Sequence, residues 1–191
     1  MNLFILNKSN GKFYYKPDTT LCRENADFYI PDYINSLNIQ SGVAVKIVKT
    51  GRCISSKFAE RYYRNINFAV NIFHRNILNT TIHIEDLAHF SSLEHSLYCI
   101  EKQSCNQSSI SFNTLYLSNG SETIEFYLGS DLKSSLNSAI ENISSVFSLK
   151  SGDLIIVVED SSVEIKRGDI VKLTACDSDY NYVKLLDFSI K

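Results

Sequence analysis

Four histidines are the residues of this sequence whose type and spacing most directly suggest metal chemistry. His83, His89 and His95 follow one another at intervals of six, and His74 lies upstream of them. Neighbours on one face of a helix are three or four residues apart, so an interval of six does not gather these side chains on a helix. We expect histidines in surface loops rather than a shared metal site.

The cysteines show no metal-binding or disulfide pattern. Cys99 and Cys105 lack the two-residue spacing of a zinc knuckle, and the total of five cysteines is odd. A chain of 191 residues is long enough to bury a core without disulfide bonds. We therefore expect reduced thiols in a reducing compartment, at Cys22, Cys53, Cys99, Cys105 and Cys176.

An acidic turn follows the apolar run LIIVV at residues 154–158. It contains Glu159, Asp160 and, slightly further on, Glu164. Carboxylates in an exposed turn usually bind only water, but three of them could also supply a cation site. The sequence contains neither a Gly-x-Ser-x-Gly elbow for a nucleophilic serine nor a glycine-rich phosphate loop.

The overall composition is that of an ordinary globular protein. Hydrophobic residues make up 44% and charged residues 21% of the chain, and the net charge is −2. This charge predicts no binding of nucleic acid, so Arg61, Arg64 and Arg75 are interpreted as part of a solvated helix face. No apolar run approaches 18 residues, and the start MNLFILNKSNGKF lacks a signal-peptide pattern. We expect no membrane association and a cytoplasmic location.

The elements that must position any site are mostly strands. Residues 3–6 and 13–15 flank NKSNG and predict a hairpin whose Asn-Gly pair adopts positive φ angles. Residues 43–48 and 68–73 predict two further strands, with a helix from Ser55 or Ser56 to Asn65 between them. This helix is expected to bury Phe58, Tyr62 and Ala59.

The C-terminal half combines one strong helix with further strands. In residues 130–149 apolar side chains recur every three or four positions, which predicts an amphipathic helix with Asp131 in its first turn. The uniformly apolar residues 154–158 predict a central strand, and residues 170–173 and 183–190 predict two more. No linker divides the chain, so we expect a single mainly β (α+β) domain spanning 1–191, with antiparallel or mixed pairing.

Several segments, in this order, resemble the fumarylacetoacetate hydrolase family, in particular its bacterial single-domain members. The similar words are KPDTTL at residues 16–21, FYIPDY at 28–33, GRCISSKFAERYY at 51–63, SSVFSLKSGDLI at 144–155, KRGDIVKL at 166–173 and LLDFSIK at 185–191. The resemblance covers roughly 13–78 and 125–191, and segment 80–124 diverges. It implies the family's mixed β-sandwich roll with two or three helices.

The resemblance also implies that the family's metal site has been lost. Family members hold Mg²⁺ or Mn²⁺ with a glutamate-x-glutamate pair on one strand and an aspartate on a later strand. These ligands correspond to Gln40, Gly42 and Asn71, none of which carries a charge. Without charged oxygen ligands, the dehydration of a divalent ion is poorly offset.

Two further family features are missing from this chain. Residues 7–15, NKSNGKFYY, are too few to contain the family's N-terminal lid segment and its histidine, so the lid region is truncated. The substrate loop threonine-glycine-threonine-proline is replaced by VVED at residues 157–160.

The resemblance thus implies a non-catalytic homologue with no catalytic residues and no cofactor, serving as a scaffold or a small-ligand-binding protein. A ligand pocket would include Lys16, Arg75, Glu159 and Asp160. The alternative is a residual hydrolase or decarboxylase that acts on a 2-oxo acid of the acylpyruvate type, with a site rebuilt around Arg75, Glu159 and Asp160.

Two structural expectations follow from the resemblance. The chain is expected to form a homodimer, as the family commonly does. Gln40 and Asn71 are expected to lie close together on adjacent strands, facing a depression near the end of residues 154–158 that Phe73 and His74 partly fill. This placement requires the helix that follows Ser55 to act as a crossover within one sheet.

Overall fold

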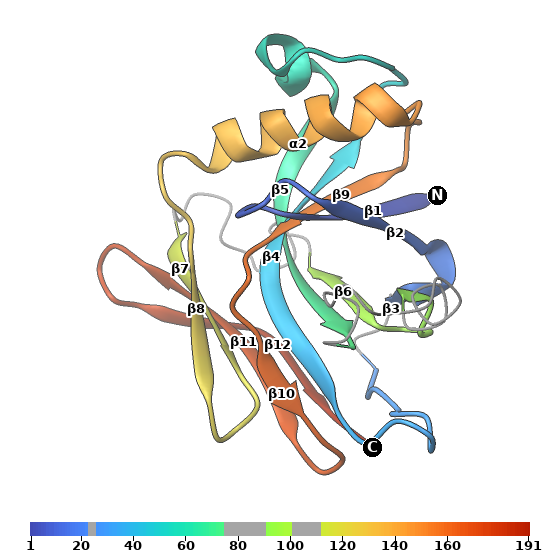
Figure 1. Cartoon of the computed structure of the whole chain (residues 1–191). Coiled ribbons are helices and arrows are strands. Elements are labelled where there is room, and N and C mark those ends of the chain that lie inside the picture. The colour runs from blue at the N-terminus through green and yellow to red at the C-terminus, as the bar shows by residue number, and fades with distance from the viewer. Residues whose placement is uncertain (23–25, 75–90, 101–111) are drawn as a thin grey trace.

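The computed structural model describes residues 1–22, 26–74, 91–100 and 112–191 and is mainly β, as expected (Figure 1). The larger sheet has the order β2 (Phe13–Pro17), β1 (Asn2–Asn7), β9 (Leu154–Val158), β4 (Leu37–Ile47), β5 (Tyr63–Phe73), β6 (Leu97–Ile100) and β3 (Leu21–Cys22), and β10 (Val163–Ile165) also pairs with β4. The smaller sheet has the order β12 (Tyr182–Ser189), β11 (Ile170–Asp177), β7 (Phe112–Ser118) and β8 (Thr123–Tyr127).

The larger sheet curls on itself because the chain joins its two ends. Strand β2 pairs with β1 at one end, and β3 pairs with β6 at the other. Only the short 3-10 helix η1 (Asp18–Thr20) separates β2 from β3. The two ends of the strand order must therefore lie close together, and the sheet forms a roll with an inner and an outer face.

The expected pairing and the expected central strand are both confirmed. Strand β9 is parallel to β1 and antiparallel to β4, so the sheet is mixed. All five residues of β9 are buried, because neighbouring strands flank it on both sides and side chains cover both of its faces.

Alternation along the strands separates two apolar clusters. The inner cluster is small and includes Leu3, Ile5, Ala44, Ile156 and Val158. The outer cluster is much larger and joins the outer face of the roll to the smaller sheet and to the helix α2 (Leu132–Val146). In Figure 1, α2 crosses one side of the roll, and the smaller sheet lies beside the roll below it.

The strong helix is shorter than expected at both ends. Helix α2 spans Leu132–Val146, and Asp131 is its N-cap residue, without a side-chain capping hydrogen bond. Its expected apolar face is confirmed at Leu136, Ile140 and Ile143, which are buried. Phe147 leaves the helix with an extended backbone and packs against Phe4.

The expected helix between β4 and β5 is wrong in type and length. The structure has a 3-10 helix there, η2 (Ser56–Arg61), which buries only Ala59 and leaves Phe58 44% exposed. It is not a crossover, because β4 and β5 are antiparallel neighbours and need only a reversing connection. Arg64 lies in β5 rather than on a helix face.

The N-terminal hairpin is confirmed, but its turn differs from the expected one. Strands β1 and β2 pair with Leu6 opposite Phe13, and the five residues 8–12 connect the two strands. Gly11 adopts a positive φ of 69°, whereas Asn10 does not and instead accepts a hydrogen bond from the backbone N–H of Lys12. No helix in the described part of the chain has the length and apolar character needed to cross a bilayer.

Candidate functional site

The inner face of the roll brings Gln40 and Asn71 together. They are directly opposite partners in the antiparallel pair β4–β5, so their side chains project to the same face. Gln40 is 5% exposed and Asn71 is fully buried. The expected placement of these two residues on adjacent strands is confirmed, although through a reversing connection rather than a crossover.

Gly42 faces the end of β9 on the same inner face. It pairs with Ala69 on one side and Val158 on the other. A Cβ atom at Gly42 would collide with the backbone oxygen of Val157 and lie 2.8 Å from Cγ1 of Val158. Strand β9 therefore occupies the space that a side chain at position 42 would need.

Asn71 is bonded to a tyrosine that the sequence analysis did not single out. Its Nδ2 donates a hydrogen bond of 2.8 Å to the hydroxyl of Tyr14 in β2, across the interior of the roll. Burial raises the pKa of Tyr14, and the hydrogen bond from Asn71 opposes this change. Among the described residues, Asn71 Oδ1 is a buried side-chain oxygen that has no hydrogen-bond partner.

Lys16 lies two residues after Tyr14 in β2 and projects to the same inner face. Its side chain is fully buried, and Nζ donates hydrogen bonds to the Ile72 carbonyl at 2.9 Å and to Ser96 Oγ at 2.8 Å. Removal from water lowers the pKa of Lys16 to about 7. Lys16 thus connects β2 to β5 and to the segment before β6, which holds the roll closed.

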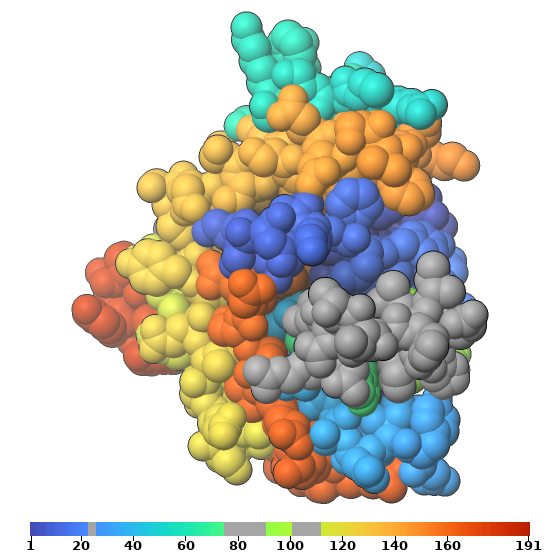
Figure 2. Space-filling model, viewed as in Figure 1, coloured from blue at the N-terminus to red at the C-terminus, as the bar shows by residue number. Residues whose placement is uncertain are grey.

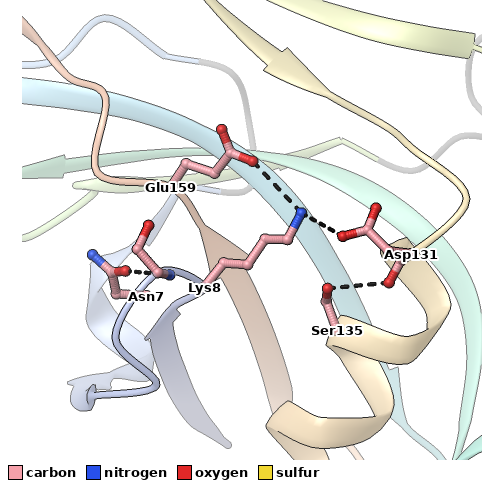
Figure 3. A network of polar contacts seen from close by, with 6 residues as sticks. Asn7, Lys8, Asp131, Ser135 and Glu159 are labelled. Carbon is pink, nitrogen blue, oxygen red and sulfur yellow. Dashed lines mark hydrogen bonds and ion pairs between the residues drawn. The ribbon is translucent and has the colours of Figure 1, made fainter.

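The acidic residues of the predicted pocket lie instead at the turn of the N-terminal hairpin, where Figure 3 shows the contact of Glu159. Glu159 forms an ion pair with Lys8 at 3.7 Å, and Asp160 accepts a hydrogen bond from the side-chain amide of Asn7. The contacts of Lys16 are with Ile72 and Ser96, so the structure does not join it to these carboxylates. Arg75 lies outside the described residues.

The remaining candidates for metal or thiol chemistry stay apart wherever they are described. His83, His89 and Cys105 lie outside the described residues, whereas His95 lines a surface pocket with Asp18 and Glu94. Burial lowers the pKa of His74. Cys22, Cys53, Cys99 and Cys176 form no disulfide. The described part of the chain contains no group of three or more His, Cys, Asp or Glu placed to hold a metal.

The residues on the inner face do not fit a divalent cation. Gln40 and Asn71 are neutral amides, and β9 excludes any side chain at Gly42. Asn71 Nδ2 is already bonded to Tyr14, which leaves one unpartnered carbonyl oxygen from this residue. Hard cations such as Mg²⁺ require several oxygen ligands, and carboxylates supply the charge that offsets dehydration.

Comparison with known proteins finds similar structures but no similar sequence. No protein-family model and no curated protein matches this sequence. Among solved structures, a fumarylacetoacetate hydrolase family protein from Yersinia pestis CO92 aligns with a TM-score of 0.74 at 16% identity, covering 100% of this chain and 92% of its own.

Two enzymes of known chemistry align equally well. Fumarylpyruvate hydrolase from Pseudomonas aeruginosa, solved with Mn²⁺ and pyruvate, has a TM-score of 0.72 at 12% identity and covers 100% of this chain and 89% of its own. A 5-carboxymethyl-2-hydroxymuconate delta-isomerase from Mycobacterium smegmatis has a TM-score of 0.73 at 13% identity and covers 99% and 76%. This protein therefore adopts the fold of the fumarylacetoacetate hydrolase family.

Proposed function

We propose that this protein is a non-catalytic homologue of fumarylacetoacetate hydrolase-type enzymes that uses no metal cofactor and acts as a scaffold or small-ligand-binding protein. The observation that carries the proposal is the approach of β9 to Gly42, which leaves no space for a side chain at that position. The neutral pair Gln40 and Asn71 beside it, with Asn71 bonded to Tyr14, supports the same conclusion.

The alternative, a residual hydrolase or decarboxylase of a 2-oxo acid, requires a rebuilt site that includes Glu159 and Asp160. These carboxylates are engaged by Lys8 and Asn7 at the hairpin turn. Neither has a described contact with Lys16, the other described residue of the predicted ligand pocket. The non-catalytic proposal therefore agrees better with the contacts.

Calorimetric titration of the purified protein with Mn²⁺ and Mg²⁺ tests the proposal. We expect flat titrations for the natural chain, together with no turnover of acylpyruvates. The double variant Gln40→Glu, Asn71→Asp places two carboxylates opposite one another on β4 and β5, and we expect it to gain weak Mn²⁺ binding. A stoichiometric micromolar isotherm with the natural chain would overturn the proposal and favour the enzyme.

A further inference from the structure

Positive charge is concentrated in one short segment of this negatively charged chain. Residues 46–64 contain six basic residues and one acidic residue, Glu60, which leaves 13 basic and 20 acidic residues for the rest of the chain. Figure 2 shows the turquoise residues around η2 projecting beyond the orange helix α2 at one end of the molecule. The six basic residues are all exposed and are named the basic patch: Lys46, Lys49, Arg52, Lys57, Arg61 and Arg64.

Two of these cations face one another across the sheet. Lys46 on β4 and Arg64 on β5 are directly opposite partners, and like charges in this position destabilise a sheet. Lys46 also pairs with Leu154 of β9, so strands flank it on both sides and its charge does not protect a sheet edge. In the described part of the chain none of the six cations forms an ion pair, whereas Lys8 and Arg167 each bind a carboxylate. The fold therefore keeps uncompensated positive charge here, although the repulsion lowers its stability.

Aromatic rings lie among the other cations of the patch. Arg61 Cζ is 5.0 Å and Lys57 Nζ is 5.7 Å from the centroid of the Phe58 ring, which is 44% exposed. Lys49 Nζ lies 5.3 Å from the centroid of the Tyr62 ring. Cations are attracted to ring faces, and side chains held in this way lose less freedom when an anion binds them. The patch thus presents both cations and an exposed apolar ring.

We propose that the basic patch binds an acidic segment of a partner protein, a stretch rich in Asp and Glu that also contains apolar residues. Clusters of arginine bind acidic motifs because a guanidinium group matches a carboxylate with two parallel hydrogen bonds. Apolar side chains of the segment would pack on Phe58. The proposal gives a partner class to the scaffold role proposed above, on which it rests. The patch shares no residue with Gln40, Gly42 and Asn71, so metal binding there and peptide binding here are tested separately.

The charge of the remaining chain favours a short segment over a larger anionic partner. A bilayer or a nucleic-acid duplex extends well beyond a patch of this size. It would approach the rest of the chain, in which acidic residues outnumber basic ones by 20 to 13 and repel an anion. A peptide segment can remain on the patch. This choice agrees with the net charge of −2, which predicts no binding of nucleic acid.

Fluorescence anisotropy with the full chain and a labelled peptide tests this proposal. The probe has about 12 residues and spans about 40 Å when extended, and most of its residues are Asp or Glu, with two phenylalanines. We expect saturable binding that weakens as NaCl is added, because salt screens exposed charges. The same peptide with Asn and Gln in place of Asp and Glu should not bind.

Two charge-reversal variants locate the binding. The double variant Arg61→Glu, Arg64→Glu should bind the acidic peptide at least about tenfold more weakly, because it reverses two charges of the patch. The matched control Lys166→Glu, Lys184→Glu changes the net charge of the chain by the same amount, at exposed lysines outside the patch. It should bind the peptide like the natural chain. Exposed positions tolerate such changes, so both variants should keep the circular dichroism spectrum of the natural chain.

Three results would overturn the proposal. The first is no saturable binding of the acidic peptide at low salt. The second is the same affinity in the patch variant and in the control, which would leave the patch without a part in binding. The third is tighter binding of a single-stranded oligonucleotide or of phosphatidylserine vesicles, lost in the patch variant, which would assign the patch to nucleic acid or to a membrane surface.

Discussion

At the scale of single residues, a hydrogen bond between two neutral side chains, Asn71 and Tyr14, crosses the inner face. Asn71 and Tyr14 are 57 positions apart in the sequence, and their contact exists only because the roll brings β2 over β5. A buried amide that loses its partner cannot be solvated by water, so it costs more than an exposed one. Tyr14 is therefore the residue through which this contact is best tested.

We predict that Tyr14→Phe lowers the free energy of unfolding by about 1–3 kcal/mol, because it leaves Asn71 Nδ2 buried without an acceptor. Urea denaturation followed by circular dichroism measures this change. Tyr15→Phe is the matched control, because Tyr15 is 45% exposed on the same strand, and it should change stability by less than about 0.5 kcal/mol. Equal effects of the two changes would contradict the prediction.

Lys16 gives a pH-dependent prediction. Its pKa is about 7 in the folded chain, against 10.5 for an ordinary lysine. Between these values the unfolded chain binds a proton that the folded chain lacks, so the free energy of unfolding rises with pH. Below about pH 7 both states are protonated and this contribution is constant.

The comparison of natural chain and Lys16→Met isolates this effect, since other titrating groups are common to both. We expect the stability of the natural chain relative to the variant to increase from pH 7 to pH 10, with a slope of up to about 1.4 kcal/mol per pH unit. Urea denaturation at several pH values provides the measurement. Parallel stability curves for the two proteins would show that Lys16 keeps the same protonation state in the folded and the unfolded chain.

At the scale of elements, β4 and β9 approach so closely at Gly42 that only a residue without a side chain fits there. We predict that Gly42→Ala destabilises the protein by about 1–3 kcal/mol, because the new methyl group collides with the backbone of β9 rather than with a movable side chain. Ser41→Ala, in the neighbouring position on the opposite face of β4, is the control and should cost less. Thermal unfolding of both variants compares them, and an unchanged midpoint for Gly42→Ala would mean that β9 can move aside.

Most helices and strands could be predicted wherever a few neighbouring residues in the sequence determine the structure. The hairpin, the central strand β9 and the apolar face of α2 follow from turn residues and periodicity over a few positions. The 3-10 helix η2 was not predictable, because its six residues carry no clear period and their conformation is set by the strands on either side. The burial of Lys16 was also missed, since lysine is rarely buried and only closure of the roll encloses it.

At the scale of the whole molecule, the smaller sheet packs one face on the common core and leaves the other exposed. Leu173 and Phe188 are buried on the face of the smaller sheet that packs on the large apolar cluster. Tyr127 and Tyr182 are 66% and 61% exposed. In the order of the described strands, β8 is at an end of this sheet, and Tyr127 lies on it. Exposed edge strands that carry aromatic residues tend to associate unless something covers them.

We propose on this basis that the chain forms a homodimer that covers the edge at β8. Light scattering at micromolar concentration should give a mass near twice the 21.7 kDa of one chain. Tyr127→Lys introduces a charge on this strand, and we expect it to shift the equilibrium toward the monomer, because burying an unpaired ammonium group at an interface is costly. Tyr180→Lys changes a tyrosine that is 80% exposed in a turn, and it should leave the mass unchanged. A mass near 21.7 kDa for the natural chain would rule out the dimer at that concentration. If Tyr127→Lys still forms a dimer, the interface does not include β8.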